Sequence, residues 1–303
     1  MKLFYVLVFI FISFGSTAQN FSWEVGGGIG TSNYFGDIGG LTDPGKKGPA
    51  DITLASTRFN VSAFTRRMMQ YRFYLNFSLS YIHISGDDQL SPNTTRTRRN
   101  LNFTNNLFEG LAMAEYHPLI INDLGGKRRF IADLHVHIST GLGLVYSEPT
   151  GKFGSTNVKL RPLKTEGPSN AYAPIQMVIP LSAGFFISFK GRYSGYKIHR
   201  VGFNLNYRLT FTDYLDDVSS VYPELSVFEG DQQAINASYR GYQSDPSQSN
   251  RYPEGAVRGN PNSNDGYLTT MFYYSKRIRG GKKKHKLPRR QEFYGKSRRS
   301  RTK

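Results

Sequence analysis

The sequence predicts an all-β fold, namely an eight-stranded antiparallel transmembrane β-barrel with long extracellular loops and short periplasmic turns. Three observations predict it. Eight segments alternate apolar and polar residues, and most have the roughly 9–11 residues that a tilted membrane strand needs. The links between the segments alternate between long and short, as in outer-membrane barrels. After the N-terminal segment no stretch is apolar and long enough for a transmembrane helix, so only a closed barrel could cross a membrane.

The N-terminal segment has the features of a secretory signal peptide. Met1-Lys2 is a short positive region, residues 3–12 are an unbroken apolar run, and Ser16-Thr17-Ala18 matches the small-x-small cleavage pattern. The run is shorter than the about 20 residues that span a bilayer, which argues against an uncleaved anchor. We therefore expect a signal peptide over residues 1–18 and an exported barrel domain over residues 19–278. The chain has no Cys, so it can form no disulfide and carry no acylated cysteine.

The strands are predicted from alternation with a period of two. The seventh is the clearest, because Val201, Phe203 and Leu205 begin an apolar row while Gly, Asn, Arg and Thr lie between its members. The first is rich in glycine. The fourth is imperfect, because it points Leu111 and Met113 inward beside two glutamates. The eight predicted strands span residues 22–30, 57–66, 73–81, 108–116, 134–144, 179–189, 201–211 and 267–275.

Loop lengths favour the barrel over a soluble β-sandwich. A sandwich has no reason to sort its loops, and its strands are usually shorter, about 5–6 residues. Aromatic residues near the predicted strand ends, Tyr34 and Phe35 among them, fit interfacial girdles. This topology places the protein in the outer membrane, surrounded by its lipids, with both termini periplasmic. Long links are predicted at 32–51, 85–101, 147–176 and 212–265, and shorter ones at 67–70, 117–128 and 190–196.

The basic charge of the chain is concentrated at its C-terminus. The last 28 residues carry 14 Lys or Arg and one acid, so they hold nearly all of the formal net charge of +17. Export argues against a nucleic-acid partner. We expect residues 279–303 to be a basic periplasmic tail, disordered when free, that attaches to an acidic envelope protein or to anionic headgroups. The alternative is a solvated tail without a partner. The residues expected to bind are Lys282, Lys283, Lys284, Lys286, Arg289, Arg290, Arg298, Arg299 and Arg301.

Several polar residues are predicted to face the barrel interior. Side chains roughly fill an eight-stranded barrel, so a porin-sized channel is not expected. A proton or metal site is one interpretation of these residues, and a polar core whose charges pair with one another is the other. We expect the paired core, and therefore no cofactor and no metal. The inward candidates are Glu109, Glu115, His135, His137, Asn206 and Arg208.

Two further groups were weighed as sites. Asp213, Asp216, Asp217 and Glu224 open the longest loop, but they lack the spacing of a calcium-binding loop, so capping carboxylates are expected. The trio of Ser80, His83 and Asp87 falls near one strand end. It has no nucleophile-elbow motif, so no catalytic residue is predicted and the chain is expected not to be an enzyme.

Five strings occur in an order that resembles the PorG-like outer-membrane barrels of Bacteroidetes, which are associated with the type IX secretion system and gliding motility. The strings lie at residues 32–37, 86–88, 99–103, 162–167 and 210–219. The resemblance implies an eight-stranded barrel without enzyme activity that docks on a periplasmic ring built by a lipoprotein and its soluble partner. The basic tail is not part of this pattern. The motif residues are Asn33, Tyr34, Gly36, Asp37, Thr212, Asp213, Tyr214, Asp216 and Asp217.

The leading hypothesis is a non-enzymatic component of the type IX protein secretion apparatus that anchors or positions this ring at the outer membrane. A general structural or adhesive barrel with no part in secretion is the alternative, because long extracellular loops would also serve adhesion. A hydrolase at the barrel rim is a third hypothesis.

Overall fold

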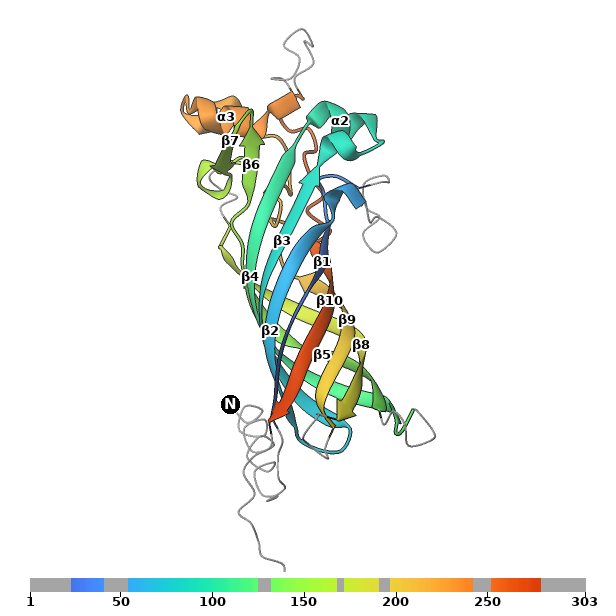
Figure 1. Ribbon diagram of the computed structural model, residues 1–303. Helices are drawn as coiled ribbons and strands as arrows, with labels where there is room; N and C mark the ends of the chain where they lie inside the picture. The colour runs from blue at the N-terminus through green and yellow to red at the C-terminus, as the bar shows by residue number, and fades with distance from the viewer. Residues whose placement is uncertain are drawn as a thin grey trace, which may run out of the picture. The chain divides into compact units, whose positions relative to one another are not determined.

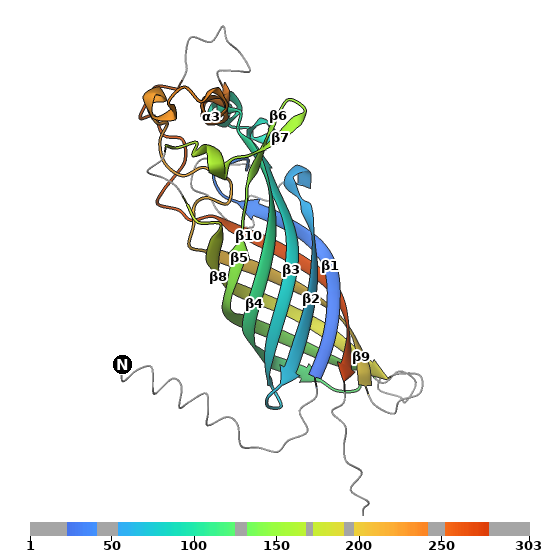
Figure 2. The same ribbon diagram turned by 90° about the vertical axis from the view of Figure 1, so that its left-hand side faces the viewer.

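Eight antiparallel strands of the described chain close into a barrel, which confirms the predicted fold class (Figures 1 and 2). The computed structural model describes residues 23–40, 54–124, 132–167, 172–190, 197–241 and 252–278. The predicted signal peptide and basic tail lie outside these residues. The sheet closes because β1 pairs with both β2 and β10. The barrel strands are β1 (Trp23–Phe35), β2 (Arg58–Met68), β3 (Phe73–Asp87), β4 (Asn102–Ile121), β5 (Ala132–Tyr146), β8 (Ile175–Lys190), β9 (Lys197–Thr210) and β10 (Gly266–Ile278).

The alternation within the strands separates an apolar outer wall from a polar interior. On β9, Val201 and Leu205 are exposed while Asn204, Asn206 and Arg208 are buried. Leu79 on β3 and Phe272 on β10 are 72% and 66% exposed. Such an arrangement inverts the polarity of a soluble protein and fits a wall that faces lipid. In the described residues no helix has the length and apolar character to cross a membrane.

The long connections all lie at one end of the barrel, here called the loop end, as predicted. They hold the helices α2 (Thr94–Arg99) and α3 (Gln232–Ser238) and the hairpin of β6 (Thr150–Phe153) and β7 (Thr156–Lys159), none of which was predicted. Short 3-10 helices η2 (Leu54–Ser56), η3 (Asp88–Leu90), η4 (Arg161–Leu163) and η6 (Leu225–Phe228) also lie in these connections. At the opposite turn end, β1 begins and β10 ends, with Trp23 paired to Ile278.

Ion pairs cross the interior of the barrel. Glu109 on β4 accepts two hydrogen bonds from Arg208 on β9, at 2.6 and 2.9 Å, and a third from the Tyr267 hydroxyl at 2.7 Å. Because β4 and β9 are not neighbours in the sheet, this pair spans the lumen. Nearer the turn end, Phe64 and Phe186 form an apolar layer with Met271 and Tyr273. Glu109 and Arg208 therefore pair with each other inside the barrel, as the sequence predicted for inward charges of a small barrel.

Candidate functional site

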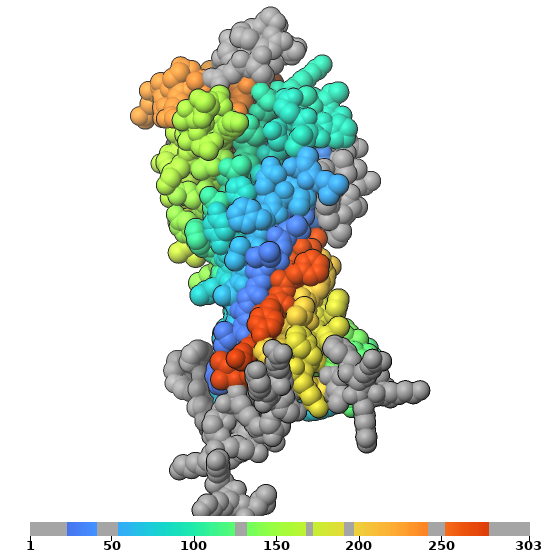
Figure 3. Space-filling model, in the orientation of Figure 1, coloured from blue at the N-terminus to red at the C-terminus, as the bar shows by residue number. Residues whose placement is uncertain are grey.

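The loop end carries a folded cap, made of residues 36–40, 88–101, 150–167, 212–241 and 252–265. In Figure 3 the cap forms a continuous mass above the barrel wall. An apolar core runs from the barrel into it and includes Ile82 and Leu107 from the strands and Leu215 and Val218 from the last connection. The motif strings that lie far apart in the sequence meet in this cap, which makes it the candidate site.

The first motif string forms the junction between β1 and the cap. The Tyr34 hydroxyl donates to Asp265 Oδ1 at 2.8 Å, and Asn33 Nδ2 donates to Thr57 Oγ1 at 2.8 Å. Gly36 is required here, because a Cβ atom would lie 1.7 Å from the Tyr34 hydroxyl. Tyr34 and Phe35 are 8% and 1% exposed, so their assignment to an interfacial girdle was wrong. They pack inside the cap junction because β1 continues beyond the apolar wall.

The second motif string is buried beside the first. Asp216 accepts from the backbone N–H of Ile38 at 3.1 Å and of Val218 at 2.9 Å. Asp217 accepts from the hydroxyls of Thr165 and Tyr172. The remaining members, Thr212 and Asp213, are buried, and Tyr214 is half-buried. Capping carboxylates in a solvated loop were predicted here. Asp216 caps two backbone N–H groups as predicted, whereas Asp217 accepts from side-chain hydroxyls, and both are buried rather than solvated.

Two arginine–carboxylate pairs tie the connections together. Asp88 is fully buried and accepts from Arg99 at 2.8 and 2.9 Å, from Gly39 N at 3.2 Å and from Leu101 N at 3.0 Å. Glu166 accepts from Arg258 Nη1 at 2.8 Å. Asp88, Arg99 and Glu166 lie in the motif strings, but no local pattern marks them as members of a site. Arg258 lies outside all five strings.

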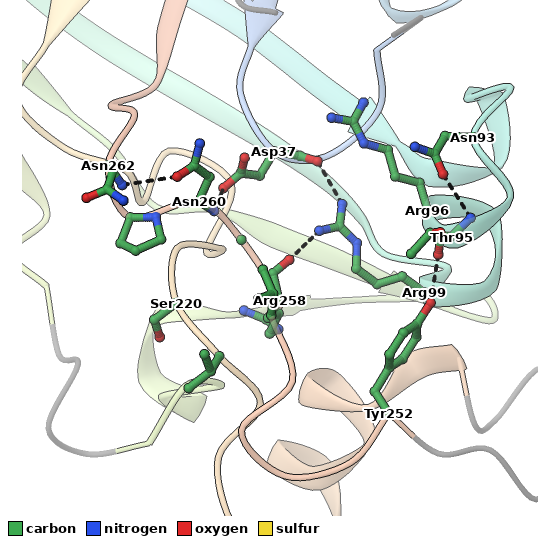
Figure 4. Close-up of a pocket in the computed structure, with 14 residues that line it drawn as sticks. Asp37, Asn93, Thr95, Arg96, Arg99, Ser220, Tyr252, Arg258, Asn260 and Asn262 are labelled. Atoms are coloured by element: carbon green, nitrogen blue, oxygen red, sulfur yellow. Dashed lines mark hydrogen bonds between the residues drawn. The ribbon is translucent and has the colours of Figure 1, made fainter. Parts of the chain in front are cut away.

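A cavity of about 570 Å³ opens between these anchors (Figure 4). Arg99 reaches across it to donate to the backbone carbonyl of Asp37 at 2.7 Å and to that of Arg258 at 2.5 Å. The Asp37 side chain accepts from Asn260 N at 2.7 Å. The arginines at this cavity thus hold the three connections together. The lining also includes Asn93, Thr95, Arg96, Ser220, Val221, Tyr252, Val257, Gly259, Pro261 and Asn262.

Burial raises the pKa values of Asp216 and Asp217 in the second motif string. It raises the pKa of Asp216 to about 7, and the neighbouring Asp37 carboxylate adds to the rise. It also raises the pKa of Asp217 to about 6, although Arg258 opposes the shift. Both carboxyls therefore bind protons more tightly in the folded cap than in an unfolded chain, where they titrate near 3.8. The resulting stabilisation is complete below about pH 4 and is lost as the pH rises through about 6 to 7.

We expect the cap to open more readily at pH 8 than at pH 5. Each proton bound more tightly by the folded cap changes the free energy of opening by about 1.4 kcal/mol per pH unit within this window. The measurement is the rate of limited proteolysis of the cap at each pH. Asp216→Asn, digested in parallel, corrects for the pH dependence of the protease and should show a weaker trend. A cap that opens faster at pH 5 would contradict the assigned direction.

A second polar group, the basal cluster, lies inside the barrel toward the turn end. Arg66 Nη1 lies 2.9 Å from Glu24 Oε1, and Arg66 Nε lies 3.0 Å from Glu115 Oε2. Arg200 pairs with the other oxygen of Glu24. Both guanidiniums lie over the ring of Phe186, at 5.3 and 4.4 Å from its centroid. The basal cluster consists of Glu24, Arg66, Glu115, His117, His135, His137 and Arg200.

The structure brings the predicted inward residues together in two places. Glu109 and Arg208 pair near the loop end, while Glu115, His135 and His137 belong to the basal cluster. His117 was placed in the predicted link of residues 117–128. Instead β4 continues to Ile121 through a register shift between Tyr116 and Leu119. Glu24, Arg66 and Arg200 were not predicted as inward residues either. The alternation on β2 and β9 indicates an inward position for the two arginines.

The trio weighed for hydrolysis is not assembled. Ser80 contacts Ser62 Oγ at 2.8 Å, His83 Nδ1 lies 2.7 Å from Asn106 Oδ1, and the Asp87 side chain caps the N–H of Gln89. Ser80 and His83 lie on opposite faces of β3 because they are three residues apart. All the residues predicted to bind a partner, from Lys282 to Arg301, lie outside the described residues.

Comparisons with known proteins give a family and distant structural likenesses. The family described as a domain of unknown function (DUF6089) matches residues 1–232. No curated protein matches the chain. Crystal structures of Ail, the attachment invasion locus protein of Yersinia pestis, are similar at 8% identity and TM-score 0.33, or at 7% and 0.32 in complex with the heparin analogue sucrose octasulfate. Each covers 86% of this chain and 100% of Ail. Neisserial surface protein A is similar at 8% identity and TM-score 0.32, covering 87% of this chain and 100% of that one.

Proposed function

We propose that this chain, which belongs to the DUF6089 family, is an integral outer-membrane barrel that serves as a non-enzymatic component of the type IX protein secretion apparatus. In this role it anchors or positions the periplasmic ring, built by a lipoprotein and its soluble partner, at the outer membrane. Both termini are periplasmic in this arrangement. The observation that carries the proposal is the convergence of the motif strings in one buried cap above a paired barrel interior.

Two features of the described residues support an anchor rather than a channel or an enzyme. The Glu109–Arg208 pair and the basal cluster fill the lumen with paired charges, which would obstruct the passage of a solute. In the cap, the carboxylates of Asp88, Asp216 and Asp217 accept hydrogen bonds from backbone and side-chain donors. These bonds hold the loops in place. These groups maintain the shape of the cap at the loop end, whereas the ring would dock at the turn end, where β1 begins and β10 ends.

Affinity purification of the tagged protein from detergent-solubilised envelopes tests the proposal. The ring lipoprotein and its soluble partner should be recovered with it. A tagged outer-membrane barrel from outside this family, solubilised in the same way, is the control for unspecific capture. Recovery of the folded barrel without either ring protein, under conditions that keep the ring itself intact, would contradict the anchoring role.

The basic tail is the proposed contact with the acidic side of this assembly. Deleting residues 280–303 should leave barrel insertion intact and weaken the recovery of the ring in a salt-sensitive way, because salt screens exposed charges beyond a distance of about 10 Å at 0.1 M. The measurement is ring recovery across a salt series. A matched variant that replaces the lysines and arginines of the tail by glutamine separates charge from length. Ring recovery that is unchanged at every salt concentration would remove the tail from this role.

The cap favours one second candidate, a surface adhesion barrel. It presents α2, α3 and the β6–β7 hairpin at the end that would face outward in this topology. In that case the cap would bind an external partner, and secretion would be normal in a deletion strain. Secretion of cargo proteins by a deletion strain separates the two candidates.

A further inference from the structure

The basal cluster brings together three side chains of the kinds that ligate metal ions. Glu115, His117 and His137 are all buried, and one ligand atom from each lies within 4.8 Å of the others. His117 Nε2 lies 2.7 Å from Glu115 Oε1. Two imidazoles and one carboxylate are a donor set that suits Zn²⁺, with a fourth position left for water. We propose that the barrel interior binds one divalent transition-metal ion of the zinc class through these three residues.

The register shift in β4 creates this grouping. Tyr116 pairs with Ile138 and Leu119 pairs with Val136, so His117 and Pro118 together lie opposite His137 alone. Such a bulge re-aims the side chains beside it. His117 thereby points inward next to His137, with ring centroids 5.6 Å apart, while Glu115 remains on the same inner face of β4.

An unpartnered nitrogen points to a ligand independently of this grouping. His137 Nδ1 is buried and has no hydrogen-bond partner among the described residues. Its other ring nitrogen, Nε2, lies 3.1 Å from Asn204 Oδ1, so Nε2–H donates to the amide and leaves a bare lone pair on Nδ1. A buried acceptor without a donor is unfavourable, because it has lost its hydrogen bonds to water. A metal ion would use this lone pair, and an imidazole oriented through its second nitrogen is the usual form of a metal ligand.

The surroundings fix the other two ligands in the same manner. Arg66 Nε holds Glu115 Oε2 at 3.0 Å, which leaves Oε1 for the metal. His117 Nδ1 lies 3.2 Å from His135 Nδ1, so His117 can donate there when its Nε2 binds the ion. His135 is half-buried and lies nearer the turn end of β5 than His137.

The charges of the basal cluster determine how favourable the binding of a divalent ion is. Glu24 and Glu115 are balanced by Arg66 and Arg200, so a divalent ion adds uncompensated positive charge. Opposing this, the ion takes the place of the hydrogen bond between His117 Nε2 and Glu115, the proton moves to His117 Nδ1, and the ion satisfies His137 Nδ1. We therefore expect binding of one ion per barrel that a chelator removes without unfolding the protein, because the strand pairing does not depend on it.

The test uses the full chain, folded in detergent and stripped with a chelator, and titrates it with Zn²⁺ and Co²⁺. Calorimetry should give one Zn²⁺ per chain, and bound Co²⁺ should show the visible absorption of a four-coordinate site. His137→Gln should abolish the Co²⁺ absorption, and His199→Gln should leave it unchanged, because His199 contacts Tyr274 outside the cluster. Asn204→Leu, which keeps all three ligands, should weaken Zn²⁺ binding by roughly 10–100-fold.

Two results would overturn the proposal. One is the absence of a Co²⁺ spectrum and of stoichiometric Zn²⁺ binding in the folded parent protein. The other is equal Zn²⁺ binding by the parent and by Asn204→Leu, which would place the metal elsewhere on the chain. If His137→Gln fails to fold, the Asn204 variant and the parent spectrum still decide the question. The outcome is independent of ring association, so it can fail while the proposed secretion role stands.

Discussion

Replacing Arg208 by methionine is expected to destabilise the barrel by about 3–5 kcal/mol, the cost of leaving one partner of a buried ion pair alone. The substitution strands the Glu109 carboxylate, which is 3% exposed and would keep only the hydroxyl of Tyr267. A charge in this position cannot reach water, because the pair spans the lumen between β4 and β9. The measurement is urea unfolding of the protein refolded in lipid vesicles, followed by gel mobility of the folded barrel.

The double variant Glu109→Leu/Arg208→Met tests whether the loss of stability comes from the unpaired Glu109 carboxylate. Replacing a buried ion pair by apolar residues of similar volume is often neutral or stabilising, so the double variant should regain most of the lost stability. Arg72→Met is the matched control, because Arg72 is exposed in the turn before β3 and should change stability by less than about 0.5 kcal/mol. An Arg208→Met barrel that unfolds at the same urea concentration as the parent would contradict the paired-interior account.

Replacing Asp88 by alanine is expected to open the cap while the barrel stays folded. The carboxylate accepts from the Arg99 guanidinium and from the N–H groups of Gly39 and Leu101, so its loss strands a buried cation and two buried donors. The expected cost is about 3–5 kcal/mol. The substitution destabilises the cap and not the barrel, because the barrel strands keep their own hydrogen bonds. Local units of a protein can open separately.

Trypsin reports this opening, because α2 carries Arg96, Arg98 and Arg99. Asp88→Ala should be cut there far faster than the parent and should retain the gel mobility of a folded barrel. Asp87→Ala is the matched control at the neighbouring position, where the side chain caps only the N–H of Gln89 and is worth about 1 kcal/mol. Equal cleavage of Asp88→Ala and the parent would show that the cap is not held together by this carboxylate.

Sequence patterns predicted the barrel where exposed apolar residues cover the outer face of a strand and polar groups its inner face. They failed where β3 and β4 leave that region. In β3 the exposed apolar residue Leu79 points outward, whereas Ile82 and Ile84 point inward into the apolar core of the cap. The sense of the alternation reverses, so the predicted strand ended at Tyr81 instead of Asp87 and β4 began at Phe108 instead of Asn102. A period-two pattern alone cannot show that the environment outside the strand has changed.

Some members of the candidate site were predictable from the sequence, but its chemistry was not. The motif strings named Asp37, Asp216 and Asp217, but their meeting in one buried cap depends on contacts between connections that are far apart in the sequence. Arg258 has no local pattern that would mark it as the partner of Glu166. His117 was hidden for a different reason, because Pro118 usually ends a strand and here lies within a bulge.

Secretion of cargo proteins by a deletion strain tests the proposed role most directly. The strain should be complemented with the parent chain and, separately, with the chain that ends at residue 278. The account predicts that cargo disappears from the medium and accumulates in the periplasm of the deletion strain, and that the parent chain restores its release. Normal secretion in a deletion strain that makes no detectable barrel would contradict a role in the type IX apparatus and would favour a surface adhesion barrel.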